Sequence, residues 1–172
     1  MERIIREAYG KEKGMEQKRS EEIILACAVQ PEQANAAGNI HGGEIMKMMD
    51  NAAGVAAQKY ARSNVVTARV NELNFKRPIH VGNLVTCYAR VVYTGRSSME
   101  IFVAVEAEDL CLDQSPHVAL TAFFTMVALD AEGHPQSVIP LEIPEDPYLL
   151  RLYREGERRY QEAKRRTRTG QA

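Results

Sequence analysis

The sequence predicts a one-domain α+β chain, in which a long apolar helix is followed by an antiparallel meander of long strands. The helix-length apolar segment runs from residue 42 to about residue 60. After it, β-branched and alternating segments are separated by turn residues, a pattern typical of antiparallel strands. Strands and helices do not alternate, so a doubly wound nucleotide-binding fold is not expected. Long strands beside one buried helix predict a single sheet that curls around it.

Bulk composition supports one domain and limits the classes of partner. A chain of 172 residues, 45% of them hydrophobic, can bury a real core. The formal net charge of -1 gives no reason to expect a nucleic acid partner or a membrane surface. No apolar run is as long as a transmembrane helix, and the N-terminus lacks the apolar core of a signal peptide. We therefore expect no membrane insertion and a cytoplasmic location.

The three cysteines, Cys27, Cys87 and Cys111, are too few for a disulfide framework, and an odd number cannot all pair within one chain. Each is expected to be a small buried apolar residue. No cysteine or histidine cluster has the spacing of a metal-ligand set, so no metal site is expected.

The expected strands follow the apolar and alternating segments of the chain. In one of them, Ile101 and Val103 alternate with Glu100, which predicts one apolar and one polar face. A single sheet leaves its edges and its other face bare, so self-association is expected. The strands are expected at residues 23–29, 65–70, 73–77 (ended by Pro78), 84–93, 99–108 and 117–129.

The chain is divided into three parts by charge. Residues 1–20 are rich in Lys, Arg and Glu and are expected to form an N-terminal arm. Residues 21–144 are the predicted folded domain. Residues 145–172 are expected to form a C-terminal helix that frays into a basic tail, most often a solvated charged surface. The alternative is that Arg165, Arg166 and Arg168 bind a phosphorylated ligand.

Asp50 is the residue of the long helix that most needs an explanation. Apolar side chains surround the helix in nearly every direction, which favours an interior position. An ionised carboxylate in an interior is unfavourable unless it is paired or used. Asp50 is therefore either a structural acid paired with a Lys or Arg, or a functional acid.

Gly42 and Gly43 lie where this helix begins. The first turn of a helix leaves backbone N–H groups unpaired, and these favour an anion or a developing oxyanion. Gly43 and Asp50 are seven residues apart, so they share one helix face about two turns apart. A carboxylate and oxyanion donors on one side form a plausible hydrolase site. The alternative for the glycines is loop flexibility or close packing.

Four stretches in order resemble one family. They are Asn39-Ile40-His41-Gly42-Gly43 with Met49-Asp50, then Val65-Val66-Thr67-Ala68, then Asn74-Phe75-Lys76-Arg77-Pro78-Ile79-His80-Val81-Gly82, and last Gly95-Arg96-Ser97-Ser98-Met99. Their order and spacing are similar to those of the hot-dog-fold acyl-CoA thioesterases. The match is to the branch of the brain-type cytosolic acyl-CoA hydrolase and the bacterial broad-range acyl-CoA thioesterases, and it covers about residues 23–140.

The resemblance implies a hot-dog fold, with a five-stranded antiparallel sheet wrapped around the central helix. It implies a dimer with active sites at the subunit interface, which in this branch assembles further as a trimer of dimers, a homohexamer. It also implies hydrolysis of CoA thioesters in fatty acid metabolism. No metal and no redox cofactor are implied, and coenzyme A takes part only as a portion of the substrate and product.

The resemblance also implies roles for residues around the helix. Asp50 matches the catalytic acid, as general base toward water or as nucleophile. Gly42 and Gly43 match the oxyanion element, with the N–H of Gly43 preferred. Asn39 positions water or the carbonyl, or caps the loop. His41 is expected to position rather than to exchange protons.

The expected CoA contacts lie farther along the chain. Arg96, with Ser97 and Ser98, lies in a turn and is expected to bind a CoA phosphate. Lys76 and Arg77 are expected on a strand, so only one of them, preferably Arg77, contacts a given ligand. The alternative for each cation is an exposed surface charge.

Three further assignments complete the expected site. Thr67 lies on the strand after the helix, where its hydroxyl could orient the attacking water or be only a strand residue. Asn35 is expected to be a loop residue, with a pocket residue as the alternative. The methionines Met46, Met48 and Met49 are expected in the core, with an acyl tunnel as the alternative.

Three functions fit the same fold, because fold does not fix function. The first is acyl-CoA hydrolysis, which includes aromatic acyl groups such as phenylacetyl. The second is a non-catalytic acyl-CoA sensor, against which Asp50 argues because binding needs no acid there. The third is a hot-dog dehydratase, for which His41 alone is poor support.

Overall fold

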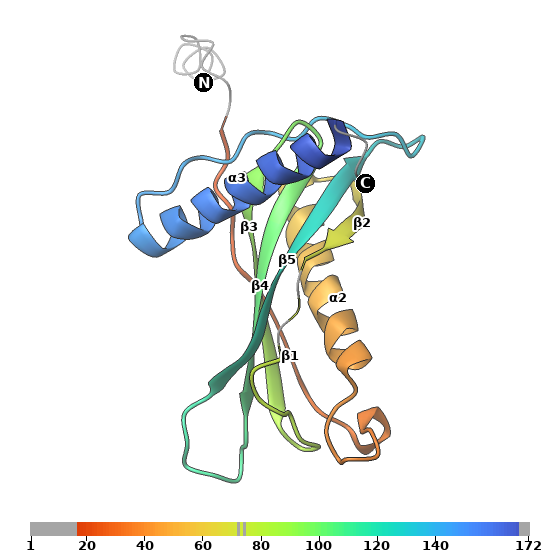
Figure 1. Ribbon diagram of the computed structural model, residues 1–172, viewed down its shortest axis with the longest axis vertical. Coiled ribbons are helices and arrows are strands. Elements are labelled where there is room, and N and C mark those ends of the chain that lie inside the picture. The colour runs from red at the N-terminus through yellow and green to blue at the C-terminus, as the bar shows by residue number, and fades with distance from the viewer. Residues whose placement is uncertain (1–16, 72, 74, 169–172) are drawn as a thin grey trace, which may run out of the picture.

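The computed structural model describes residues 17–71, 73 and 75–168. Five strands and two long helices make up the fold (Figure 1). The predicted N-terminal arm lies largely outside the described residues. The elements are β1 (Ile23–Ala28), the 3-10 turn η1 (Pro31–Gln33), α2 (Gly42–Ala61), β2 (Asn64–Val70), β3 (Leu84–Thr94), β4 (Ser98–Glu108), β5 (His117–Leu129) and α3 (Pro147–Arg168).

The strands form one antiparallel sheet with the order β1-β3-β4-β5-β2. The sheet curls around α2, and α3 crosses its opposite face (Figure 1). β1 and β2 are the two edge strands. The predicted α+β fold, a five-stranded antiparallel sheet around a central helix, is confirmed.

The core lies between α2 and the concave face of the sheet. Alternate residues of β4 point into it, as the sequence predicts for a strand. Small side chains on the helix let its backbone approach the sheet closely. The fully buried members include Ile45, Met49, Ala52, Ala53 and Ala57 of α2 and Met99, Ile101, Val103, Val105 and Ala107 of β4.

The helix α2 is not enclosed on every side, so its predicted interior position is wrong for one face. Met46 and Val55 are 41% and 40% exposed, and Lys47 and Asn51 are also exposed. The reason is that the sheet covers only one side of the helix. Asp50 lies at the border between the two sides and is half-buried.

The C-terminal segment also differs from its prediction. The expected C-terminal helix is present as the 22-residue α3, but it packs on the outer face of the sheet instead of forming only a solvated charged surface. Val92, Phe123 and Leu152 are buried between this helix and the sheet. The helix approaches so closely at Gly156 that an added Cβ would lie 2.9 Å from Cβ of Tyr93. One end of the outer face is therefore covered.

The segment expected as a strand at residues 73–77 is not one among its described residues. The backbone N–H of Lys76 donates to Ala119 O at 2.9 Å, which keeps this stretch beside β5. Pro78 lacks an N–H and restricts the residue before it, so a strand ladder is not continued here. The expected alternation of Lys76 and Arg77 between two sheet faces is therefore wrong.

The cysteines divide into two environments. Cys87 is buried, as predicted, whereas Cys27 and Cys111 are exposed. Cys27 lies on the edge strand β1 and Cys111 in the β4–β5 connection, where the sheet gives no cover. In the described part of the chain, no helix is long and apolar enough to cross a membrane.

Candidate active site

The start of α2 offers two free backbone donors. The N–H groups of Glu44 and Ile45 donate to His41 O at 3.0 and 3.3 Å. Among the described residues, no acceptor takes the N–H of Gly42 or of Gly43. Gly43 is exposed, and a Cβ there would meet no atom within 4 Å. The side chain of His41 is also exposed and does not cap the helix. The helix therefore begins with donors that a ligand can reach.

Asp50 faces outward from the middle of α2 toward the edge strand β2. Its Oδ1 accepts a hydrogen bond of 2.6 Å from the hydroxyl of Thr67. In the part of the chain that the structure describes, Asp50 forms no ion pair with a Lys, Arg or His. The alternative of a structural acid paired with a cation therefore has no partner there.

A shallow depression of about 310 Å³ opens at this pair. Gly54 and Val55 of the helix form one wall of the depression, and Met126 of β5 contributes to the opposite wall. Oγ1 of Thr67 also lies 3.3 Å from Sδ of Met126. The carboxylate and the hydroxyl are thus accessible from outside the single chain.

A second depression of about 450 Å³ lies at the start of α2. It brings together four residues of the predicted site, Asn39, Gly42, Lys76 and Arg77. The ring of Phe75 lies only 3.3 Å from the place of a Cβ on Gly42, so a larger residue there would press on the ring. The side-chain amide of Asn39 and the two cationic side chains therefore lie beside the free donors of the helix.

Asn39 and Asn35 shape the loop that leads into the helix. Oδ1 of Asn35 accepts from the N–H groups of Ala37 at 2.9 Å and Asn39 at 3.3 Å. Asn35 is thus a loop residue, as expected, and it holds Asn39 in place. Oδ1 of Asn39 is buried and has no hydrogen-bond partner within the described residues.

The turn with Arg96 lies at the opposite end of the sheet from the start of α2 (Figure 1). Ser97 O accepts from Ala128 N at 2.9 Å, and Ser98 O accepts from Gly95 N at 2.8 Å, so the turn is well fixed. The side chain of Arg96 is exposed. A single chain therefore does not bring Arg96 to Gly42 and Gly43.

Sequence reasoning missed a polar cluster on the far face of the sheet. Arg69, Glu100 and Thr125 meet between β2, β4 and β5, and Glu100 is only 1% exposed. The signal that could have found it is a glutamate in a strand whose neighbours are apolar. Burial raises the pKa of Glu100 to about 7, against the opposing effects of the Thr125 hydrogen bond and the Arg69 and Arg159 charges.

Comparison with known proteins assigns the chain and its fold to one family. The family model described as Thioesterase superfamily matches residues 37–111. The acyl-CoA thioester hydrolase YciA of Escherichia coli is 36% identical over 123 residues, which are 70% of this chain and 92% of that protein. This chain belongs to the acyl-CoA thioester hydrolase family.

Other members of the family extend the comparison. The cytosolic acyl coenzyme A thioester hydrolase of Mus musculus is 38% identical over 141 residues. That match covers 81% of this chain but only 37% of the mouse protein, so the chain spans well under half of that relative's length.

Solved structures of the family share the fold. An apo-hexameric acyl-CoA thioesterase is 34% identical with a TM-score of 0.79, covering 85% of this chain and 92% of its own. A Staphylococcus aureus acyl-CoA hydrolase, solved with butyryl coenzyme A, is 32% identical with a TM-score of 0.79, covering 87% of this chain and 91% of its own. Three further structures of it each replace one residue by alanine, an asparagine, an aspartate or a threonine. The asparagine precedes the aspartate by 15 residues, and the threonine follows it by 17.

Proposed function

We propose that this chain hydrolyses acyl-CoA thioesters to free coenzyme A and a carboxylic acid. The observation that carries the proposal is the Asp50 carboxylate, held by Thr67 at 2.6 Å beside an open depression. In a family of acyl-CoA thioester hydrolases, an accessible carboxylate without a cationic partner among the described residues is suited to chemistry. The proposed reaction uses water and the CoA ester, with no resident cofactor.

The hydroxyl of Thr67 orients the carboxylate for either of two roles. With Oδ1 taken by Thr67, Oδ2 of Asp50 accepts a proton from water as the water attacks the thioester carbon. Alternatively, Oδ2 attacks that carbon itself and forms a mixed anhydride, which water then hydrolyses. In both routes the C–S bond breaks and coenzyme A leaves as the thiol.

The oxyanion formed in this reaction needs donors, and we assign them to the start of α2. The N–H of Gly43, with that of Gly42, is proposed to bind the thioester oxygen as negative charge develops on it. Along the helix axis, Gly43 and Asp50 are about 10 Å apart at 1.5 Å per residue. One thioester with one water and hydrogen bonds of about 3 Å does not easily span that distance. We therefore propose that the helix start of a second copy completes each site.

The edge strand β2 is the proposed place where two copies meet. Within the part of the chain that the structure describes, β2 pairs only with β5, and Val66 and Val70 on it are exposed. An exposed apolar edge strand is a template for pairing with another chain. Because Thr67 lies on this edge, a dimer formed here would place Asp50 at the interface. Family members described as hexameric support a trimer of such dimers.

Spacing in the Staphylococcus aureus enzyme supports the assignment of individual residues. Asn35 precedes Asp50 by 15 residues and Thr67 follows it by 17, as do the residues replaced by alanine in that protein. We therefore propose Asn35 as a functional residue beside Asn39. His41, exposed at the helix start, is proposed to position substrate rather than to exchange protons.

Coenzyme A is proposed to bind through cations at both ends of the sheet. Arg96, with Ser97 and Ser98, offers a guanidinium and turn amides for phosphate at one end. Lys76 and Arg77 line the depression at the other end. In a dimer, cations from two copies can serve one extended ligand.

The test separates hydrolysis from mere binding. Thiol release is followed from acyl-CoA esters of increasing chain length, and binding of the same esters is measured by calorimetry. We expect turnover, with one range of acyl lengths preferred. Binding without thiol release from any ester would instead identify a non-catalytic acyl-CoA sensor.

A further inference from the structure

A one-residue bulge interrupts the edge strand β2 beside the proposed site. Thr67 pairs with Met126, but the next pair along the ladder joins Arg69 to Thr125, so Ala68 is the extra residue. Residues two apart in a regular strand point to the same face of the sheet. The bulge breaks this rule and sends Thr67 and Arg69 to opposite faces.

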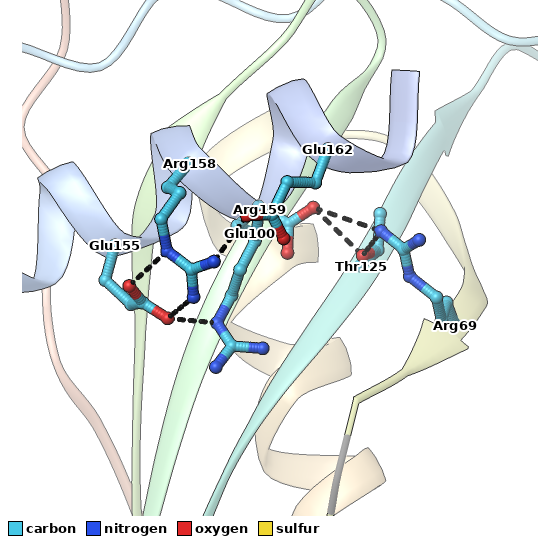
Figure 2. Close-up of polar contacts among 7 residues, drawn as sticks. All are labelled: Arg69, Glu100, Thr125, Glu155, Arg158, Arg159 and Glu162. Carbon is cyan, nitrogen blue, oxygen red and sulfur yellow. Dashed lines mark hydrogen bonds and ion pairs between the residues drawn. The ribbon is translucent and has the colours of Figure 1, made fainter. Parts of the chain in front are cut away.

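The two side chains have separate tasks on those faces. Thr67 points toward α2 and donates to Asp50. Arg69 points toward the face that α3 covers, where its Nη2 donates to Oγ1 of Thr125 at 3.3 Å and lies 4.0 Å from Oε1 of Glu100. The hydroxyl of Thr125 donates to the same Oε1 at 2.9 Å (Figure 2).

The buried Glu100 explains why Arg69 points to this face of the sheet. A carboxylate that is 1% exposed is strongly unfavourable without donors and a counter-charge. Thr125 supplies a donor and Arg69 a counter-charge, both at Oε1. Oε2 has no hydrogen-bond partner within the described residues. In a regular strand without the bulge, either Arg69 would leave Glu100 or Thr67 would leave Asp50. The cluster therefore favours the bulged register.

We propose that Arg69, Glu100 and Thr125 are positioning residues that fix the bulge and so hold the hydroxyl of Thr67 against Asp50. They act through Thr67 from the far side of the sheet and do not touch the substrate. The inference rests on the proposed thioesterase function and goes beyond it, because it assigns these three residues an indirect role in turnover.

A double-mutant cycle tests the proposal. The variants Arg69→Met, Thr67→Val and the pair are compared with the wild type by kcat and KM for one acyl-CoA. We expect Arg69→Met to lower kcat about tenfold with KM nearly unchanged, because a small misplacement near reacting atoms is costly. In the Thr67→Val background it should change kcat less than about twofold, since its effect passes through the missing hydroxyl. Equal losses in both backgrounds would overturn the proposal.

Arg90→Met is the matched control. Arg90 lies on β3, donates to Ser20 O at 2.8 Å and pairs with Glu22, away from the bulge. Its replacement should leave kcat within about twofold of the wild type, because these contacts do not reach β2. A tenfold loss in this control as well would mean that any lost sheet arginine lowers turnover, and would contradict the proposal.

A second readout does not depend on turnover. Amide hydrogen exchange in β2 should become faster in Arg69→Met, while exchange at the β3–β4 pairing should stay as in the wild type. Unchanged exchange in β2 would contradict the anchoring of the bulge, even for an active enzyme. Conversely, the wild type could release no thiol while Arg69→Met still speeds exchange in β2. That result would refute the thioesterase function and leave the anchoring of the bulge intact.

Discussion

Two carboxylates in this chain show how access decides what a side chain can do. Asp50 and Glu100 each accept a hydrogen bond from a threonine hydroxyl, at 2.6 and 2.9 Å. Asp50 borders an open depression, whereas Glu100 is sealed between the sheet and α3. The first can meet water and substrate, and the second can only organise its surroundings.

The free donor of Gly43 can be removed without disturbing the helix. Proline is tolerated in the first turn, where its missing N–H has no intrahelical acceptor, so Gly43→Pro should fold. We expect it to lower kcat about 100-fold, the usual loss for one oxyanion donor. The control is Gly43→Ala, which keeps the N–H and places its Cβ in open space, and it should lose less than about tenfold. Equal kcat values in steady-state assays of the two variants would argue against an oxyanion role.

At this scale, the sequence predicts Asp50 but not its partner. The acid stands out because its helical neighbours are apolar, a local signal. Its hydrogen bond with Thr67 joins residues 17 positions apart. That bond depends on a bulge in β2 that the local sequence pattern does not predict. The alternation of the strand predicts Glu100 on its polar face, and only the position of α3 shows that this face is buried there.

At the scale of elements, α3 is the main difference from the prediction. Its charges favour a solvated helix and tail, but one helical face packs on the sheet, formed by Leu149, Leu152, Tyr153 and Gly156. The five observed strands and α2 were predictable because their patterns are local and regular, whereas residues 73–77 carry a similar pattern but form no strand among their described residues. The docking of α3 was not, because it depends on which sheet face remains uncovered.

The covered face makes stability depend on pH through Glu100. Arg69, Thr125 and Arg159 face this carboxyl, yet burial raises its pKa from 4.5 to about 7. Between these values the folded chain keeps a proton that the unfolded chain releases, so stability falls as pH rises. Relative to Glu100→Gln, we expect the wild type to lose about 2 kcal/mol of unfolding free energy from pH 5 to pH 8.

Urea unfolding at the two pH values, at one protein concentration, measures this difference. Glu108→Gln, at the far end of β4, is the control and should keep the pH dependence of the wild type. Parallel pH profiles for the wild type and Glu100→Gln would show that Glu100 does not titrate in this range.

At the scale of the whole molecule, the parts of the proposed site lie apart within one chain. Asp50 and Thr67 lie at the β2 edge, the free N–H groups lie about two helical turns away, and the β3–β4 turn with Arg96 lies at the end of the sheet opposite those N–H groups. Association of copies through β2 would join these parts. Self-association could be expected from the bare sheet edges, but the choice of β2 as the proposed interface depends on the structure.

A charge on that edge should separate the copies. Val66→Lys places an ammonium on β2, a common device against edge pairing. We expect a smaller assembly by light scattering and at least a tenfold loss of thiol release at the same protein concentration. Ile143→Lys, at an exposed apolar residue outside β2, is the control. A fully active monomer of Val66→Lys would contradict a site built from two copies.

Thiol release by the wild type and Asp50→Asn, compared on the acyl-CoA ester that the wild type prefers, tests the central claim most directly. Asparagine keeps the size of the side chain but can neither accept the proton from water nor attack the thioester carbon well, so kcat should fall by at least about 100-fold. Asp113→Asn, a loop residue, serves as the matched control and should remain active. Turnover by Asp50→Asn close to that of the wild type would contradict the account.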